Sequence, residues 1–294
     1  MKVAILYRKD GNERDISVIS ANEVYKALRK LGYKPVRLAF SENMELDRLK
    51  SFDIAFNLVY GQYGEDGILA SIMQALKIPF VSPPVSNCLL TFNKLTTKKV
   101  LSLFGIRTPR QIQEIPLIFK PVTGGSSERV LLINTKSELN KMQEEIVGNS
   151  NNYLLEEFLV GREFCVTAIM RRGQLIQLPI AEIKKDGAIF SREEKYGGLK
   201  KYIEIPAKIS LDLQNEIEDI CQGCFKFLNC GIYVKADVIL DSKGKPNVIE
   251  VDGIPGFGPN SVLTNAAKFF GISFEKLVEI LINETKETFK YSSA

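Results

Sequence analysis

The strongest constraint on the fold is a regular alternation of short apolar segments and helical segments over residues 1–82. The apolar runs predict strands at 3–7, 35–40, 54–60 and 79–82. The segments between them predict helices at 17–31, 46–52 and 65–76. Such alternation is typical of a parallel sheet with helices on its faces. Ligands bind at the carboxyl ends of such strands, so we expect the loops 8–16 and 61–66 to carry function.

The rest of the chain is richer in strands. After a helix at 94–104 and a boundary at Thr108-Pro109, strands are expected at 117–120, 129–133 and 153–158, with a helix at 137–145. A hairpin is expected at 164–171 and 175–181, followed by a long polar loop at 184–201. From Ser210 onward we expect a helix, a second hairpin, a Gly/Pro-rich loop at 253–259 and two helices. This pattern favours antiparallel sheets with a mobile flap and a long functional loop.

Composition excludes several classes of function. The chain has 294 residues and a net charge of +4, without the basic block that nucleic-acid binding needs. No apolar run is long enough to cross a membrane, and the N-terminal residues indicate a first strand rather than a signal peptide. The absence of histidine excludes Ser-His and Cys-His triads. Five cysteines, an odd number, argue against a disulfide framework, and we expect Cys221, Cys224 and their neighbour Cys230 to be packed around a helix rather than to bind metal.

Three carboxylates near the C-terminus predict a metal site. Asp237 lies in one apolar segment, and Glu250 and Asp252 lie two residues apart in the next, so these two share a face of a strand. If the segments form a hairpin, Asp237 approaches the same face. Three acids would repel one another without a cation among them, and hard carboxylate oxygens suit Mg²⁺ with substrate phosphates.

Other candidates have two readings from the residues alone. The Gly/Ser loop after Lys120-Pro121 could donate N–H and hydroxyl groups to a phosphate, or it could be an ordinary hairpin turn. Glu156 and Glu157 could meet a nucleotide, or they could be a solvated strand end. Glu13 could hold a ligand ammonium, but the spacing favours an acid at a helix start. Lys94, Lys120 and Lys195 matter only if they meet the same phosphates.

Taken in order, these motifs resemble the D-alanine–D-alanine ligase family of the ATP-grasp superfamily, over essentially the whole chain. The matching stretches are Glu13-Arg14-Asp-Ile-Ser17, Gly64-Glu-Asp-Gly-Ile-Leu69, Phe92-Asn-Lys94, Phe119-Lys-Pro121 with Gly125-Ser-Ser127, Leu155-Glu-Glu-Phe-Leu with Gly161-Arg-Glu-Phe164, Lys195-Tyr196, Asp237-Val-Ile-Leu240, and Glu250 through Pro255-Gly256. The resemblance implies an ATP-grasp α/β fold. A parallel N-terminal α/β subdomain (1–92) would join central (93–183) and C-terminal (184–294) α+β subdomains that clasp ATP.

The resemblance also implies a reaction and its residues. A carboxylate would attack the γ-phosphate of ATP, and the amine of a second amino acid would then attack the acyl phosphate, which joins two D-alanines for peptidoglycan synthesis. ATP would be held by Lys94, Lys120, Glu156, Glu157, Leu159, Glu163 and Lys195. Two Mg²⁺ ions, or Mn²⁺ in their place, would be held by Asp237, Glu250 and Asp252. The first amino acid would meet Glu13 and Tyr60, the carboxylate of the second would meet Ser261 and Val262, and closure and oxyanion stabilisation would involve Glu13, Ser126, Tyr196, Lys235 and Gly256.

Three residues depart from the family pattern. Tyr60 stands where the family usually has His, Lys235 where it has Arg, and Asp252 where it has Asn. The alternative is therefore an ATP-grasp carboxylate–amine ligase for a different pair of substrates. The resemblance further implies small-molecule amino-acid substrates, a cytoplasmic location and a homodimer, without a nucleic-acid or membrane partner.

Overall fold

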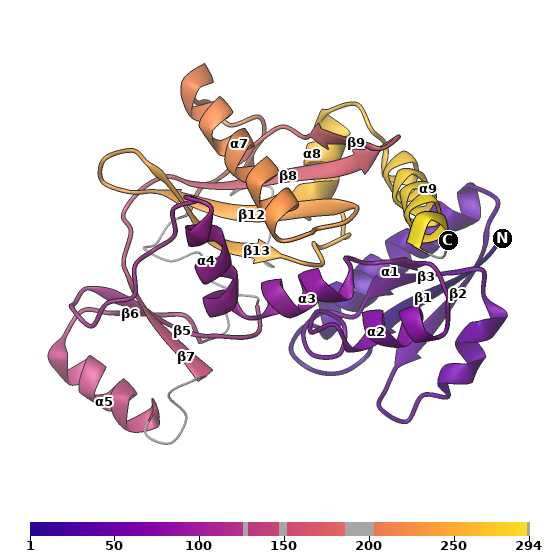
Figure 1. The fold of residues 1–294 in the computed structure, drawn as a ribbon, viewed down its shortest axis with the longest axis horizontal. Coiled ribbons are helices and arrows are strands. Elements are labelled where there is room, and N and C mark those ends of the chain that lie inside the picture. Colours follow the sequence, from indigo (N-terminus) through magenta and orange to yellow (C-terminus); the bar gives the residue numbers. More distant parts are fainter. Residues whose placement is uncertain (126–128, 147–151, 186–202, 293–294) are drawn as a thin grey trace.

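The computed structural model describes residues 1–125, 129–146, 152–185 and 203–292. The strands in this part of the chain form three sheets. Figure 1 shows the N-terminal sheet at one end of the molecule, a small sheet at the other end and the largest sheet between them.

The N-terminal sheet is parallel, as the alternation predicts. Its strands lie in the order β2-β1-β3-β4, with bounds β1 (Lys2–Arg8), β2 (Lys34–Phe40), β3 (Ile54–Leu58) and β4 (Phe80–Val81). The connecting helices are α1 (Arg14–Lys30), the 3₁₀ helix η1 (Leu46–Ser51) and α2 (Ile68–Ala75). Ser17 in α1 ties two strand ends together, because its Oγ accepts from the Arg8 N–H at 2.7 Å and donates to the Leu58 carbonyl at 2.5 Å. The carboxyl ends of β1 and β3 therefore meet, as expected.

Two predictions in this region are wrong in detail. The helix expected from residue 65 begins at Ile68, because Gly67 has φ +90° and the Asp66 side chain accepts the Ile68 N–H at 3.0 Å. Residues 61–66 therefore stay in the loop. The sequence reading also missed helix α3 (Val85–Phe92), which precedes α4 (Lys94–Leu103).

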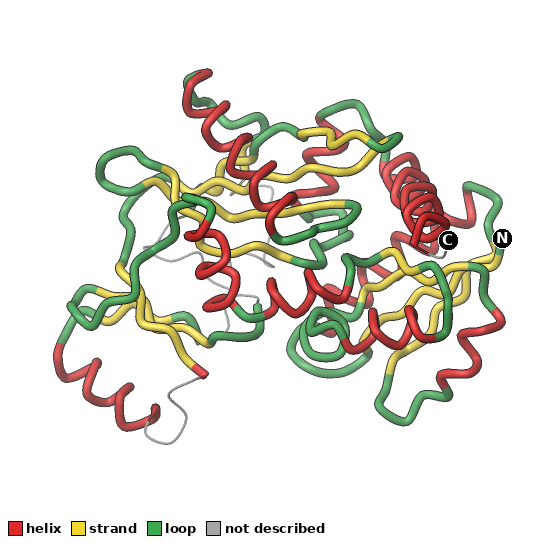
Figure 2. Tube along the Cα trace, in the orientation of Figure 1, coloured by secondary structure: helices red, strands yellow, loops and turns green. Residues whose placement is uncertain are grey.

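The small sheet is antiparallel, in the order β6-β5-β7. Its strands are β5 (Leu117–Pro121), β6 (Leu131–Ile133) and β7 (Tyr153–Glu157), and helix α5 (Lys136–Ile146) connects β6 to β7. In Figures 1 and 2, α5 covers the outer side of this sheet.

The largest sheet has six strands, in the order β11-β10-β8-β12-β13, with β9 also paired to β8. The strands are β8 (Glu163–Arg171), β9 (Gln174–Gln177), β10 (Ala181–Ile183), β11 (Ile203–Glu204), β12 (Tyr233–Leu240) and β13 (Pro246–Asp252), and α7 (Leu211–Phe227) packs against them. The second arm expected at 175–181 is in fact divided into β9 and β10. The sheet also joins strands on both sides of the division expected at 183–184.

The last two helices return to the N-terminal sheet. Helix α9 (Phe274–Ser292), which follows α8 (Val262–Phe269), lies beside α1 in Figure 1, and Lys30 Nζ donates to Glu275 Oε1 at 2.8 Å. Ile5 and Val24 share one buried cluster with Leu277 and Leu281. The two ends of the chain thus build a common core.

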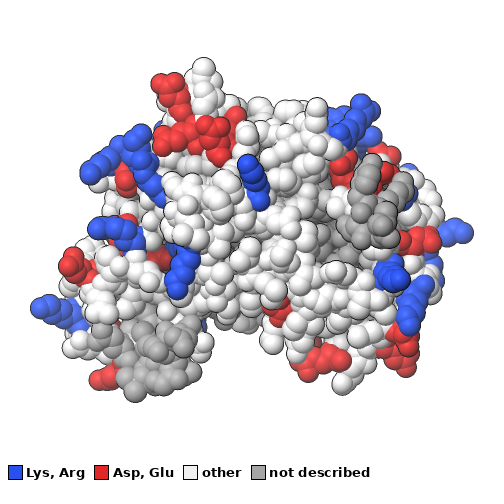
Figure 3. Space-filling view, in the orientation of Figure 1, with Lys and Arg blue, Asp and Glu red and all other residues white. Residues whose placement is uncertain are grey.

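The cysteines are structural in the way the sequence predicts. All five are free and buried, and Cys221 and Cys224 pack inside α7 with Cys230 just after it. Burial raises the pKa of all three thiols. In the described ranges no helix is both long and apolar enough to span a membrane. On the face drawn in Figure 3, Lys and Arg side chains are scattered and interspersed with acids.

Candidate active site

The predicted acidic hairpin is present and brings four charged side chains together. Strands β12 and β13 are antiparallel, with Asp237 opposite Glu250 and Lys235 opposite Asp252. Residues two apart on a strand share a face, so these four side chains form a square on one face of the sheet. A register shift after Asp237 ends this regular pairing.

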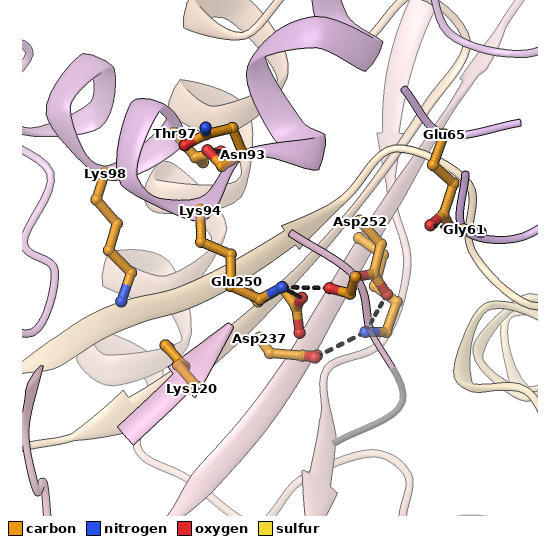
Figure 4. Close-up of polar contacts among 12 residues, drawn as sticks. Gly61, Glu65, Asn93, Lys94, Thr97, Lys98, Lys120, Asp237, Glu250 and Asp252 are labelled. Atoms are coloured by element: carbon orange, nitrogen blue, oxygen red, sulfur yellow. Dashed lines mark hydrogen bonds and ion pairs between the residues drawn. The ribbon is translucent and has the colours of Figure 1, made fainter. Parts of the chain in front are cut away.

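Two lysines form ion pairs with the three acids and offset part of their negative charge. Lys235 Nζ lies 2.8 Å from Asp237 Oδ2 and 2.7 Å from Asp252 Oδ2. Lys94 Nζ, which reaches across from α4, lies 3.1 Å from Glu250 Oε1 and also donates to the Gly124 carbonyl. Figure 4 shows Lys94 beside Glu250, and it draws dashed lines to the carboxylates of Asp237 and Asp252.

Burial and neighbouring charges shift the pKa values of two members of the square, Asp252 and Lys235. Burial raises the pKa of Asp252 to about 6, against the lowering effect of Lys235, although 29% of the side-chain surface remains exposed. Burial acts in the opposite sense on the Lys235 ammonium, but Asp237 and Asp252 outweigh it and raise the pKa of Lys235 well above its usual value. The site is thus strongly anionic and holds its lysine charged.

The donor set fits Mg²⁺, with one rearrangement. As the described side chains stand, no three acids are gathered tightly enough to surround an ion. The ammonium groups of Lys235 and Lys94 lie instead among carboxylates that would face the metal. Mg²⁺ prefers hard carboxylate oxygens, but ammonium groups occupy these oxygens here, so binding of the ion would have to displace the lysine contacts.

One cavity opens on the side of this square that faces the small sheet. It is lined by Lys94, Lys120, Gly124, Gly125, Arg129, Glu157, Leu159, Glu163, Lys185, Asp237 and Glu250, together with apolar residues such as Ile118 and Ile239. Lys94 opens helix α4, where the Asn93 side chain accepts the Thr96 N–H at 2.9 Å. Glu163 accepts from Lys185 at 3.0 Å. Basic groups, flat apolar walls and the expected Gly loop suit a nucleotide with its phosphates.

Behind this cavity lies a buried charge network of two expected residues, Glu156 and Lys120, and one that the sequence reading missed, Lys98. Glu156, whose side chain is 2% exposed, pairs with Lys98 and accepts from Lys120 Nζ at 2.7 Å. Burial raises the pKa of Glu156, but the two lysines outweigh it and lower the pKa, while burial and Lys120 lower the pKa of Lys98 to about 7. Glu156 is absent from the cavity wall, so its carboxylate acts here by fixing Lys120. Lys98 lies one helical turn after Lys94, a spacing that could have identified it.

The second cavity lies on the opposite side of the square and holds the expected amino-acid residues. Its lining includes Glu13, Tyr60, Lys235, Gly256, Ser261 and Val262. Ser261 caps helix α8, and its Oγ accepts the Thr264 N–H at 3.3 Å. The α8 N-terminus thus faces the cavity with the partial positive charge that suits a carboxylate. The two cavities share Gly124, Gly125, Glu163, Asp237 and Glu250.

Glu65 is a site residue that the sequence reading assigned to a helix. Gly64 allows a sharp turn, since a Cβ there would lie 1.6 Å from the Val59 carbonyl oxygen. The turn directs Glu65 into the second cavity, where its carboxylate accepts the Gly61 N–H at 2.9 Å. Burial, followed by the charges of Glu13 and Asp252, raises the pKa of Glu65 well above its usual range.

Two other expected residues, Glu157 and Leu159, line the first cavity, and three lie beyond the described ranges. Glu157 on β7 accepts from Arg110, and Leu159 lines the first cavity. Ser126, Lys195 and Tyr196 lie outside the described residues, so their expected closure over the substrates stays a prediction.

The comparisons with known proteins agree with this geometry. The family model described as "D-ala D-ala ligase C-terminus" matches residues 94–283. The chain is 29% identical to the D-alanine–D-alanine ligase of Clostridium perfringens strain SM101, over 97% of this chain and 98% of the relative. It is also 29% identical to D-alanine–D-alanine ligase A of Bacillus cereus, over 95% of this chain and 96% of the relative. The crystal structure of the Bacillus anthracis D-alanine–D-alanine ligase complexed with ATP superposes with a TM-score of 0.84 at 26% identity, covering 99% of both chains.

Proposed function

The chain belongs to the D-alanine–D-alanine ligase family, and we propose that it joins the carboxylate of one D-alanine to the amine of another at the expense of ATP. The fold is the expected ATP-grasp fold. The product is a dipeptide precursor of peptidoglycan, and the intermediate is an acyl phosphate.

A single observation carries the proposal: the acids Asp237 and Glu250 line both cavities. A group passed from one cavity to the other must cross this shared wall. Phosphoryl transfer from a nucleotide in the first cavity to a carboxylate in the second would take place there. Such a transfer needs alignment and charge neutralisation more than a covalent protein group.

On the nucleotide side, Lys94 and Lys120 would hold the phosphates. Lys120 is fixed by Glu156, so its ammonium group is oriented before ATP binds. Lys94 is held by Glu250 and the Gly124 carbonyl, and its contact with Glu250 would give way to Mg²⁺. Glu157, Leu159 and Glu163 would meet the adenine and ribose. Asp237, Glu250 and Asp252 would hold Mg²⁺, which would neutralise charge on the transferred phosphoryl group.

On the amino-acid side, Glu13 would bind the ammonium of the first substrate. The carboxylate of the second would lie at the α8 N-terminus, against Ser261 and Val262. Its free amine would then face the acyl carbon, with Lys235 and the Gly256 N–H placed to stabilise the oxyanion.

The decisive experiment measures phosphate release from ATP with Mg²⁺ over a panel of D- and L-amino acids. Release with D-Ala alone, with the dipeptide as product, is the expected result. Release only with another pair would point to a different carboxylate–amine ligase, in line with Tyr60, Lys235 and Asp252. The absence of release with every pair would refute a ligase function.

The proposal also includes the division into subdomains, the location in the cell and the oligomeric state. The proposed division into subdomains at 92–93 and 183–184 is kept, although β8 pairs with β12 and β10 pairs with β11 across the second boundary. A cytoplasmic location follows from the use of ATP. A homodimer is expected, and sedimentation velocity would test it.

A further inference from the structure

Tyr60, which stands where the family usually has His, lies just after β3 and makes contacts with residues far along the chain. Its hydroxyl lies 3.4 Å from the Pro255 carbonyl oxygen and 3.1 Å from Ser20 Oγ. The Phe257 N–H donates to both hydroxyls, at 3.3 Å each. Tyr60 and Ser20 thus hold the two peptide groups on either side of Gly256.

The planarity of the peptide bond gives these contacts a direction. The Pro255 carbonyl and the Gly256 N–H belong to one peptide unit, which is trans because the cis bonds of the described residues are Ile115-Pro116 and Ile205-Pro206. In a trans peptide the C=O and N–H point to opposite sides of the chain. A carbonyl held by the Tyr60 hydroxyl therefore turns the Gly256 N–H the other way.

The surroundings leave this segment little freedom. Ser20 and Phe257 are fully buried and Tyr60 is 4% exposed. The Phe257 ring packs edge-on against Phe56, with centroids 5.3 Å apart. A Cβ on Gly256 would come within 3.3 Å of Ile16 and Ser261, and Gly256 lines the amino-acid cavity. Burial also raises the pKa of Tyr60, which keeps the hydroxyl protonated and able to donate.

We propose that Tyr60 is a positioning residue that orients the Gly256 N–H for the oxyanion of the tetrahedral intermediate. The inference rests on the proposed function for the role of Gly256, but the geometry of the hydroxyl contacts stands without it. The proposal explains the replacement of His by Tyr60, because the tyrosine hydroxyl contacts the protein's own backbone at Pro255 and Phe257.

The test compares two Tyr→Phe substitutions that both lie beside Phe257. Tyr60→Phe removes the contacts to Pro255 and Phe257, and we expect kcat to fall by about tenfold or more while KM for ATP and for the first amino acid changes by less than about twofold. The affinity for a phosphinate dipeptide that mimics the tetrahedral intermediate should fall by the same factor as kcat/KM. The control is Tyr233→Phe, because the Tyr233 ring also packs on Phe257 but its buried hydroxyl has no hydrogen-bond partner among the described residues. It should leave kcat unchanged.

A second readout does not depend on turnover. Amide hydrogen exchange at Gly256 and Phe257, measured by NMR on protein labelled with ¹⁵N-Gly and ¹⁵N-Phe, should be faster in Tyr60→Phe than in the wild type or in Tyr233→Phe. Unchanged exchange would overturn the positioning role even if the wild type proved to be inactive with D-Ala. Faster exchange with normal kcat, or a raised KM for the first amino acid with normal kcat, would also overturn it, the latter in favour of direct substrate contact.

Discussion

The two cavities differ sharply in charge. Among the described residues, the nucleotide cavity is lined by four basic side chains (Lys94, Lys120, Arg129, Lys185) and four acidic ones (Glu157, Glu163, Asp237, Glu250). The amino-acid cavity has one lysine, Lys235, against six acids (Glu13, Glu65, Glu163, Asp237, Glu250, Asp252). The first is therefore balanced before its ligand arrives, whereas the second needs cations, which a substrate ammonium and Mg²⁺ would supply. In Figure 4, Lys98 and Lys120 lie to one side of the shared acids and Glu65 to the other.

The largest effect is expected from a substitution in the wall that the two cavities share. Glu250→Gln keeps the shape but removes one charge from both cavities, and we expect turnover to fall about a thousandfold, or ~4 kcal/mol in the barrier. Circular dichroism and thermal melting should show a retained fold. Turnover within about threefold of the wild type would mean that the metal assignment is wrong.

The charge network behind the nucleotide cavity should stabilise the fold as well as bind ATP. Glu156→Gln leaves Lys98 and Lys120 buried beside a neutral amide, and we expect the free energy of unfolding to fall by about 3 kcal/mol in urea denaturation at neutral pH. Glu157→Gln, the adjacent residue paired with the exposed Arg110, should cost less than ~1 kcal/mol.

The difference in stability between the wild type and Glu156→Gln should depend on pH. Burial raises the pKa of Glu156, but Lys120 and Lys98 outweigh it and hold the folded pKa below the ordinary value of 4.5. Its stabilising contribution is therefore complete above the unfolded-state pKa and is lost as pH falls through the folded pKa. The gap in stability between the wild type and Glu156→Gln should close in acid; a constant gap would contradict this account.

Two substitutions, one in each cavity, should affect the binding of different substrates. Glu13→Gln should weaken apparent binding of the first amino acid by about fiftyfold through loss of a charged partner for its ammonium, with KM for ATP changed by less than about threefold. Lys120→Met should do the reverse. The measurement is the initial rate with each substrate varied in turn, which gives KM for ATP and for the first amino acid. Equal changes in both KM values would show that the cavities do not act separately.

The smallest effect concerns the extra acid of the square. Asp252→Asn restores the usual family residue, and we expect the Mg²⁺ concentration for half-maximal activity to rise about fivefold, which is ~1 kcal/mol, the energy of unit charges about 4 Å apart in water. An unchanged or lower magnesium requirement would show that Asp252 does not contribute to metal affinity.

The sequence predicted those features of the fold that depend on residues close together in the chain. The alternation of strands and helices, the acidic hairpin and the cysteines of α7 follow from periodicity and turn residues over short stretches. Glu65 was placed wrongly because Gly67 and the cap by Asp66 outweigh a helical pattern. The Lys98–Glu156 pair and the contact of Tyr60 with Pro255 join residues 58 and 195 positions apart, and no periodicity reports such distances.

The packing of α9 on α1 has a consequence for how the chain is made. Domains generally fold from the N-terminus as synthesis proceeds, yet the apolar face that holds Ile5 and Val24 is covered by Leu277 and Leu281. The part of this cluster that α9 covers stays exposed until α9 has been synthesised and has packed. A nascent chain that stalls before α9 would therefore expose apolar side chains of this cluster, and such exposed apolar surface makes a folding intermediate prone to aggregation.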